Sequence, residues 1–165
     1  MQTYYRTAIS HPDSICVCAL NDDGEVCGFV LGPLVSAGFN KRIILANKLA
    51  YCWAGIKIAF TRPKALIRLK NNLDKIEPST NDDGLYAEVA LIGVSPDSQG
   101  KGVGRQLFIE FEKEAKRRGA TKICLTTDYI DNDGVVAAYN AWGLKEWYNY
   151  ISYPDRKMYK MFKGI

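Results

Sequence analysis

The strongest constraint on the fold is a strand that runs into a glycine-rich loop and then into a helix. Residues 85–94 (LYAEVALIGV) form a near-continuous apolar and β-branched run, the pattern of a strand covered on both faces. Alternate glycines follow at positions 100, 102 and 104, and a helix is predicted from about Gly104 to Arg118. Its expected buried face consists of Val103, Leu107, Phe111 and Ala115. The sequence therefore predicts a central strand that leads directly to a helix N-terminus.

Shorter patterns predict the elements on either side of this unit. The β-prone runs Ile15–Leu20 and Val26–Leu31 flank a turn cluster that contains Asp23-Gly24, so they predict a hairpin. The remaining predictions are a strand over residues 122–127, a helix over 133–141, and a closing hairpin of strands 144–151 and 158–162. The expected order is β-β-α-α-β-α-β-α-β-β, an α/β (α+β) fold with helices on the faces of a mixed sheet.

One segment contains most of the positive charge. Between Val26 and Leu73 there is no acidic residue, and helical spacing of apolar residues predicts a helix from about Lys41 and a shorter one from Pro63. The expected apolar face of the first helix is Leu45, Leu49, Cys52, Ile56 and Phe60. The positive charges are Lys41, Arg42, Lys48, Lys57, Arg62, Lys64, Arg68 and Lys70. Such a segment fits a solvated helical face, a wall that binds an anionic molecule, or a contact with a membrane surface or an acidic partner.

Length and composition limit the class of protein. A chain of 165 residues with 47% hydrophobic residues is the size of one globular domain, so we expect a single domain over residues 1–165. A net charge of +4 is too small to imply nucleic-acid binding. We expect no signal peptide and no membrane span, because the most apolar stretch, residues 43–60, contains three interrupting polar residues.

The cysteines predict a reducing compartment. The five residues Cys16, Cys18, Cys27, Cys52 and Cys124 contain no CxxC pair and have no histidine at metal-ligand spacing. We therefore expect buried thiols, a cytoplasmic protein and no metal site.

The glycine-rich loop predicts an anion site. Backbone N–H groups at a helix N-terminus favour phosphate groups, and the glycines allow close approach. The P-loop pattern is not met because Gly102, not Ser or Thr, follows Lys101, and the dinucleotide pattern fails because the third glycine is at 104 rather than 105. Tight packing of strand against helix, without a ligand, is the alternative interpretation.

Two motifs resemble those of a known family. Val94-Ser95-Pro96, followed by Gln99-x-x-Gly102-x-Gly104, resembles the acetyl-CoA-binding signature of the GCN5-related N-acetyltransferases (GNAT). Asn132, Tyr139 and Gly143-Leu144 are similar in spacing to the family's second block, and residues 87–90 resemble its histone-acetylating branch. The resemblance covers about residues 85–163.

The resemblance implies an architecture and a cofactor site. It implies a mixed, mostly antiparallel sheet with helices on both faces, an acetyl-CoA-binding core over residues 85–163, and an inserted basic helical segment over 33–78. The family's N-terminal strand is expected to be missing, and the extra helices lie between the third and fourth family strands. The implied cofactor-binding residues are Ile92, Gly93, Val94, Gln99, Gly100, Lys101, Gly102, Val103, Gly104, Arg105, Asn132 and Tyr139.

The same resemblance assigns catalytic roles to two residues. Tyr139 is the expected general acid, since a phenol with a pKa of about 10 stays neutral at pH 7 and can protonate a thiolate; the alternative is that it only packs beneath Trp142. Glu88 is the expected general base. The alternatives are that Glu88 pairs with a structural Lys or Arg or lies at a wet strand end, and that a water chain serves as base.

The expected function is acetyl-CoA-dependent transfer of an acetyl group to a primary amine, with no metal. The expected acceptor is a small molecule that carries negative charge, such as an amino sugar or a nucleotide-linked amino sugar. Protein lysine or N-terminal acetylation, and a non-catalytic acyl-CoA-binding module, are the alternatives. The C-terminal aromatic residues leave room for a homodimer.

Overall fold

The computed structural model describes residues 2–51, 53, 82–152 and 154–165. The predicted helix from Pro63 and most of the basic segment lie outside these residues. Residues 2–10 form a helix, α1 (Gln2–Ser10), which the sequence patterns did not predict. The described residues before the first hairpin therefore contain no strand.

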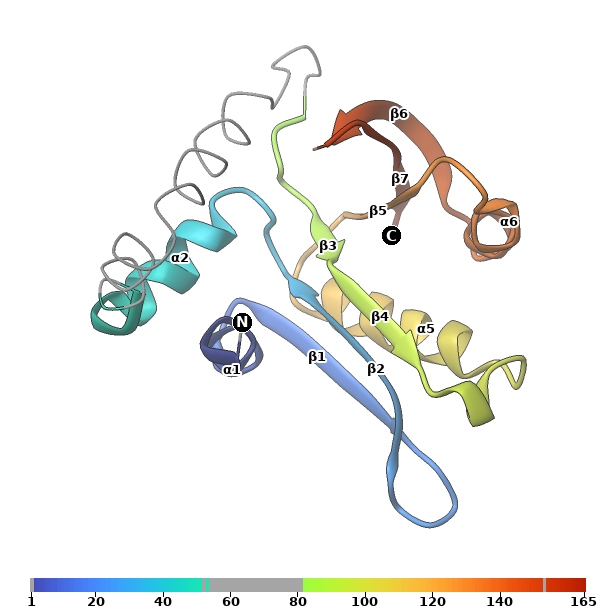
Figure 1. Ribbon diagram of the computed structural model, residues 1–165, viewed down its shortest axis with the longest axis horizontal. Coiled ribbons are helices and arrows are strands. Elements are labelled where there is room, and N and C mark those ends of the chain that lie inside the picture. The colour runs from blue at the N-terminus through green and yellow to red at the C-terminus, as the bar shows by residue number, and fades with distance from the viewer. Residues whose placement is uncertain (1, 52, 54–81, 153) are drawn as a thin grey trace.

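The strands form two sheets that share one stretch of chain (Figure 1). The antiparallel sheet β1-β2-β4 contains β1 (Ser14–Leu20), β2 (Val26–Pro33) and β4 (Leu91–Val94). The second sheet, in the order β3-β5-β7-β6, contains β3 (Ala87–Val89), β5 (Lys122–Asp128), β7 (Arg156–Gly164) and β6 (Lys145–Ser152). Among the strands that the structure describes, only the β3–β5 pair is parallel. The mixed, mostly antiparallel architecture and both predicted hairpins are thus confirmed.

The apolar run 85–94 is two strands rather than the single central strand that we expected. Before Ala90 the chain pairs with β5, and after Ala90 it pairs with β2. The cause is the close approach of β2 at Gly32, where an added Cβ would lie 1.7 Å from the carbonyl oxygen of Glu88. The Ala90 N–H donates to the Leu31 carbonyl at 3.1 Å and fixes the crossing.

The helices cover both faces of the β1-β2-β4 sheet. Adjacent residues of a strand point to opposite faces. Leu31 packs in a cluster with Ala8 of α1 and with Phe39 and Ile43 of α2 (Phe39–Ala46), whereas Val30 packs against α5 (Val103–Arg117). The last helix, α6 (Asp133–Ala141), connects β5 to β6 along the chain. In Figure 1 it lies at the right of the view, to the right of β7.

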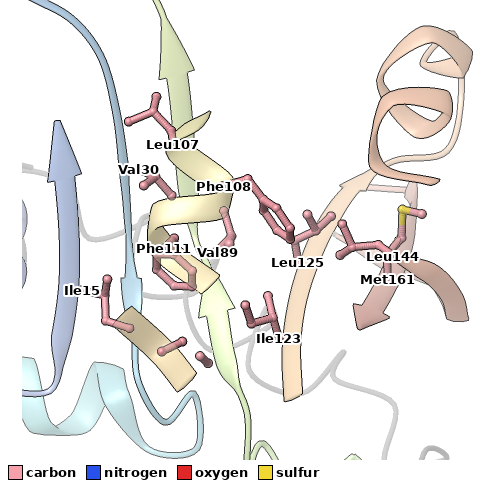
Figure 2. Close-up of a cluster of buried hydrophobic side chains, with 12 residues drawn as sticks. Ile15, Val30, Val89, Leu107, Phe108, Phe111, Ile123, Leu125, Leu144 and Met161 are labelled. Atoms are coloured by element: carbon pink, nitrogen blue, oxygen red, sulfur yellow. The ribbon is translucent and has the colours of Figure 1, made fainter. Parts of the chain in front are cut away.

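The main core lies between α5 and the two sheets, as Figure 2 shows. Leu107, Phe111 and Ala115 of α5 are buried as predicted, and Phe108 joins them. Gly119 has a φ of 89° and ends this helix in the left-handed region, also as predicted.

Two expectations about buried residues are wrong. Leu45 and Leu49 are 59% and 82% exposed, because the helix ends at Ala46 and turns the face of Phe39 and Ile43 towards α1. Cys16 and Cys18 are exposed because Ile15 of the same strand faces the core, so its neighbours alternate to the other face. Cys27 and Cys124 are buried as expected, and Cys52 lies outside the described residues.

Among the residues that the structure describes, none of the helices combines the length and the apolar composition needed to span a bilayer.

The crossing at Gly32 predicts a large stability effect. We expect Gly32→Ala to lower the free energy of unfolding by about 3 kcal/mol or more, since a methyl group there overlaps backbone atoms of β3 that have no room to move. Urea unfolding measures this effect. The control is Gly134→Ala in α6, where an added Cβ meets nothing within 4 Å and stability should rise by about 0.5–1 kcal/mol. Equal stability of Gly32→Ala and the parent chain would contradict the tight crossing.

Candidate functional site

The loop between β4 and α5 presents backbone N–H groups to solvent. After β4, one turn of 3₁₀ helix (Pro96–Ser98) leads to Gly100 and Gly102, whose φ values of 73° and 83° are in the left-handed region. An added Cβ at either glycine would meet nothing within 4 Å. Gly102 caps α5 without a side-chain hydrogen bond, and within the described part of the chain no acceptor takes the N–H groups of residues 100–105. Consecutive free N–H groups at a helix N-terminus form an anion-binding cradle.

Polar and aromatic side chains surround this cradle. Lys101 and Arg105 are exposed beside it, and Gln99 Nε2 donates to the carbonyl of Val94 at 3.3 Å, which ties the loop to the end of β4. The ring of Trp142 lies 3.6 Å from where a Cβ at Gly104 would stand. The cradle is therefore open to solvent on the side of Gly100 and Gly102 and closed by an aromatic ring at Gly104.

On the side that faces away from β2, β4 has no strand partner among the described residues, and the side chain of Gln99 bonds to the Val94 carbonyl there. Ser95 N–H donates to the Cys27 carbonyl at 2.8 Å, so in an antiparallel ladder Gly93 also bonds to β2 while Ile92 and Val94 point the other way. On that side β5 pairs with β3 and not with β4. The free edge of β4 therefore leads straight into the cradle, and an extended polar molecule can bind along it as an added strand.

Tyr139 and Asn132 lie on α6 or at its start. The Tyr139 ring packs against Trp142 with 5.3 Å between ring centroids, and burial raises the pKa of its phenol above the ordinary value. Trp142 also contacts Gly104, so Tyr139 and the cradle share one aromatic neighbour. Asn132 Nδ2 donates to Thr127 Oγ1 at 2.7 Å and to the Asp128 carbonyl at 2.9 Å. The amide nitrogen of Asn132 therefore holds the start of α6 against the end of β5.

Glu88 is part of a half-buried ion pair. Its Oε1 lies 2.7 Å from Nζ of Lys160 on β7, and its Oε2 accepts from Ser36 Oγ at 2.5 Å. Lys160 is 7% and Glu88 23% exposed. Burial is the largest influence on Lys160 and lowers its pKa, but the charge of Glu88, the hydrogen bond to it and smaller contributions from Cys124 and Tyr148 together raise the pKa of the ammonium group. The partner that the alternative interpretation of Glu88 required is thus present.

A second carboxylate lies next to this pair. Asp82 Oδ2 accepts hydrogen bonds from Tyr148 at 2.6 Å and from Tyr86 at 3.0 Å. Burial raises the pKa of Asp82, but the bonds from Tyr148, the Gly84 N–H and Tyr86 hold it below the ordinary value. Lys160 Nζ lies 4.8 Å from the centroid of the Tyr86 ring, which joins the two groups. Together they form one polar cluster of Ser36, Asp82, Tyr86, Glu88, Tyr148 and Lys160.

Of this cluster, the sequence pointed to Glu88 as a catalytic residue and to Tyr148 only as one of the C-terminal aromatic residues. The signal for Lys160 was available: it is a charged residue within the otherwise apolar and aromatic strand 158–162, as Glu88 is within 87–94. Two opposite charges, each inside an apolar strand, point to a pair because an unpaired buried charge is costly. The signal for Ser36, Asp82 and Tyr86 is absent, since all three lie in loops that only the tertiary fold brings together.

The structure places the expected site residues in two groups joined by β4. The cradle, Trp142 and Tyr139 lie at the carboxyl end of β4. Glu88 lies on β3, six residues before Val94, which is about 20 Å along an extended chain. Ile92 and Gly93 lie between them on β4.

Few positive charges of the basic segment lie in the described part. Arg42 is not free: its Nε lies 2.9 Å from Asp13 Oδ2, and its guanidinium donates to the carbonyls of Val35 and Ala37. Arg42 therefore has a counterion, which comes from outside the basic segment. Lys41 and Lys48 are exposed, and the other lysines lie outside the described residues. In the ranges that the structure describes, no three side chains gather as a metal site would require.

Comparisons with known proteins agree on one family. The sequence profile of the Acetyltransferase (GNAT) family matches residues 1–144. The mycothiol acetyltransferase of Kocuria rhizophila is 30% identical over 79 residues, which are 48% of this chain and 26% of that protein. The chain thus spans about a quarter of the length of this relative.

Two solved structures share the fold. The ribosomal-protein-S18-alanine N-acetyltransferase of Escherichia coli superposes with a TM-score of 0.60 at 15% identity, over 99% of this chain and 76% of that one. A candidate streptothricin acetyltransferase from Bacillus anthracis, in complex with acetyl coenzyme A, gives a TM-score of 0.61 at 15% identity over 98% and 68%.

The ion pair predicts a non-additive stability effect. Lys160→Met leaves the Glu88 carboxylate half-buried without its partner and should lower the free energy of unfolding by about 3–5 kcal/mol. The double variant Lys160→Met/Glu88→Gln should recover most of this loss. The raised pKa of Lys160 means that its charge stabilises the folded state fully at any pH below the pKa of an unfolded lysine, about 10.4. The loss of stability in Lys160→Met should therefore be constant around neutral pH. Additive losses in urea unfolding would show that the two charges are independent.

Proposed function

Because the chain belongs to the acetyltransferase (GNAT) family, we propose that it is an acetyl-CoA-dependent N-acetyltransferase that acts on a primary amine. One observation carries the proposal: the unpaired edge of β4 leads into a cradle of free N–H groups at the start of α5. An extended chain with amide groups that ends in a pyrophosphate matches both parts.

The residues present fit acetyl-CoA. The N–H groups of residues 100–105, with Lys101 and Arg105, would hold the pyrophosphate, and Gln99 would position the loop. Backbone groups of Ile92 and Val94 would pair with the pantetheine amides, with Gly93 between them bonded to β2. Val103 and Gly104 contribute the first turn of α5. Asn132 would act indirectly, by fixing the start of α6 beside the site.

When bound, acetyl-CoA supplies an acetyl group activated as a thioester. Further along the same edge of β4, away from the cradle, a backbone N–H would donate to the thioester oxygen as negative charge develops there. Tyr139 would donate its proton to the departing sulfur, and its raised pKa keeps the phenol neutral at every working pH. Glu88, which contacts Lys160 and Ser36, would accept the proton of the amine through bound water, because it lies on β3 and not beside the cradle.

The proposed acceptor is a small molecule that carries negative charge, such as an amino sugar or a nucleotide-linked amino sugar. Lys41 and Lys48 are exposed cations of a segment without acidic residues, which supports an anionic acceptor. The relative in Kocuria rhizophila is a mycothiol acetyltransferase, which supports a small molecule. The Escherichia coli neighbour, which acts on a protein alanine, keeps N-terminal acetylation as the second candidate. A homodimer is also part of the proposal.

An acceptor screen tests the class of substrate. Release of free thiol from acetyl-CoA is followed while amino sugars, sugar-nucleotide amines, polyamines, amino acids and peptides are added in turn. For an anionic acceptor, kcat/KM should fall as salt shortens the screening length from about 8 Å at physiological ionic strength to about 3 Å at 1 M, and Lys48→Ala should reduce this salt dependence. Efficient turnover of a polyamine would contradict an anionic acceptor, and binding of acetyl-CoA without release by any amine would favour the non-catalytic module.

The cradle predicts where acetyl-CoA binding is lost. Gly102→Glu places a carboxylate among the free N–H groups, so we expect affinity for acetyl-CoA, measured by calorimetry, to fall at least about 10-fold through charge repulsion alone. The matched control is Gly164→Glu at the end of β7, where an added Cβ also meets nothing within 4 Å and affinity should not change. Circular dichroism confirms that each variant folds. Unchanged affinity in folded Gly102→Glu would place the pyrophosphate elsewhere.

The assignment of Tyr139 predicts a kinetic effect without a binding effect. Tyr139→Phe keeps the ring against Trp142 but removes the proton donor, so kcat should fall by about 10²-fold or more while the Kd for acetyl-CoA stays constant. Steady-state kinetics between about pH 6 and 9 measure the change. Near-normal turnover across this range would make the phenol structural.

A further inference from the structure

The free edge of β1 is a second unpaired row of backbone groups, at the opposite end of the same sheet. Leu34 N–H donates to the Asp13 carbonyl at 2.7 Å, so in this antiparallel ladder the odd residues of β1 bond to β2 and the even residues point outwards. The outward carbonyl of Ser14 accepts from Arg118 Nη1 at 2.7 Å. The outward N–H and C=O groups of Cys16 and Cys18 meet no partner among the described residues.

Within the part of the chain that the structure describes, this edge lacks the features that keep strands from pairing. Proteins blunt an exposed edge with charged residues, proline, bulges or a covering segment. The strand Ser14–Leu20 (SICVCAL) has no charge and no proline, and its only irregularity comes at its end, between Ala19 and Leu20. The middle of β1 is therefore a straight, uncharged template for another strand.

A row of charges on α5 runs beside this edge. An open groove of about 430 Å³ lies between residues 14–17 of β1 and Glu110, Lys113, Glu114 and Arg117 of α5. The charges alternate in sign along the row. If a second copy of α5 lay antiparallel beside the first, each charge of one row would face an opposite charge of the other. Glu110 of one copy would face Arg117 of the other, and Lys113 would face Glu114.

We propose that a second copy of this chain binds at this edge, with the two β1 strands antiparallel about a two-fold axis. The axis stands perpendicular to the sheet, so both sheets keep the same face towards their α5 helices, and the two helices run antiparallel with complementary charges. The result is one continuous sheet across both copies. This inference does not depend on the proposed acetyltransferase activity, because it uses neither the cradle nor the polar cluster.

The pairing brings exposed thiols of the two copies together. Residues that share a face must pair, so even-numbered residues of one β1 face even-numbered residues of the other. Any register centred on residues 16–18 therefore sets a cysteine of one copy opposite a cysteine of its partner, with Cβ atoms about 4.5–5.5 Å apart. Burial and the neighbouring Cys18 thiol raise the pKa of Cys16, so thiolate repulsion does not oppose the contact at neutral pH.

The first test is the mass in solution. Analytical ultracentrifugation should give twice the 18.5 kDa of the chain, and Cys16→Lys/Cys18→Lys should give the monomer, because four ammonium groups then crowd one edge. The control Val26→Lys/Ile130→Lys adds the same charge at other exposed positions and should remain a dimer. Monomeric parent chain, or a dimer that persists in the cysteine double variant, would overturn the proposal.

The second test uses the charge row without touching β1. Inverting all four charges (Glu110→Lys, Lys113→Glu, Glu114→Arg, Arg117→Glu) keeps the ion pairs within α5 and keeps the row self-complementary. The inverted chain should therefore dimerise with itself but mix poorly with the parent chain, where like charges would meet. Differently tagged chains, unfolded and refolded together, should give few mixed dimers. A ratio of one parent dimer to two mixed dimers to one inverted dimer, as random pairing gives, would show that α5 does not take part in the contact.

The third test reads the register from the thiols. Diamide oxidises two thiols to one disulfide while its N=N bond takes up two hydrogen atoms. Treated parent chain should give a covalent dimer on a non-reducing gel, and mass spectrometry of the linked peptides should join residues 14–20 of both copies. Cys16→Ser/Cys18→Ser should give no such link. A covalent dimer joined only through other cysteines would contradict the pairing.

Discussion

The close crossing of β2 over the chain at Gly32 determines how the rest of the molecule is built. A side chain at position 32 would overlap the carbonyl of Glu88, so only glycine lets β2 come this near. At this point the apolar run of residues 85–94 stops pairing with β5 and begins to pair with β2. Because the two halves of the run belong to different sheets, β4 keeps one edge of unpaired backbone. An edge of this kind is usually a liability in a protein, and here it is the edge along which we propose that acetyl-CoA binds.

Glu88, the centre of the polar cluster, lies on β3, two residues before the crossing at Ala90. A half-buried ion pair is rarely worth more to stability than an apolar pair of the same size. Glu88, Lys160 and Ser36 nevertheless satisfy one another with bonds of 2.5–2.7 Å. We interpret the pair as a means of holding a carboxylate in one place inside an apolar strand, which is what a general base needs. The buried phenols on Asp82 hold a second carboxylate in the same way.

Local sequence signals predicted the elements well, and tertiary contacts account for the errors. The hairpins, the buried face of α5 and the left-handed glycines follow from periodicity and turn chemistry, which act over a few residues. The division of residues 85–94 depends on a residue of β2 that is more than 50 positions away, so no pattern within the run could reveal it. The exposed face of α2 and the exposed Cys16 and Cys18 were mispredicted because apolar residues were assumed to be buried. In the site, Glu88 and the cradle came from the sequence, while Lys160, Asp82 and Tyr86 needed the fold.

Among the described residues, the β1-β2-β4 sheet is bounded by two edges that have no strand partner, and these edges differ in character. The inner edge, on β4, is short, ends at a helix N-terminus and lies next to polar and aromatic side chains, all of which favour a small charged ligand. The outer edge, on β1, is uncharged, ends in solvent and lies next to a row of alternating charges, which favours a protein strand with a matching helix. Because β2 joins both edges, pairing on β1 would also hold β2 in place against Gly32 and Ala90. The two edges therefore share β2 as their common neighbour in the sheet.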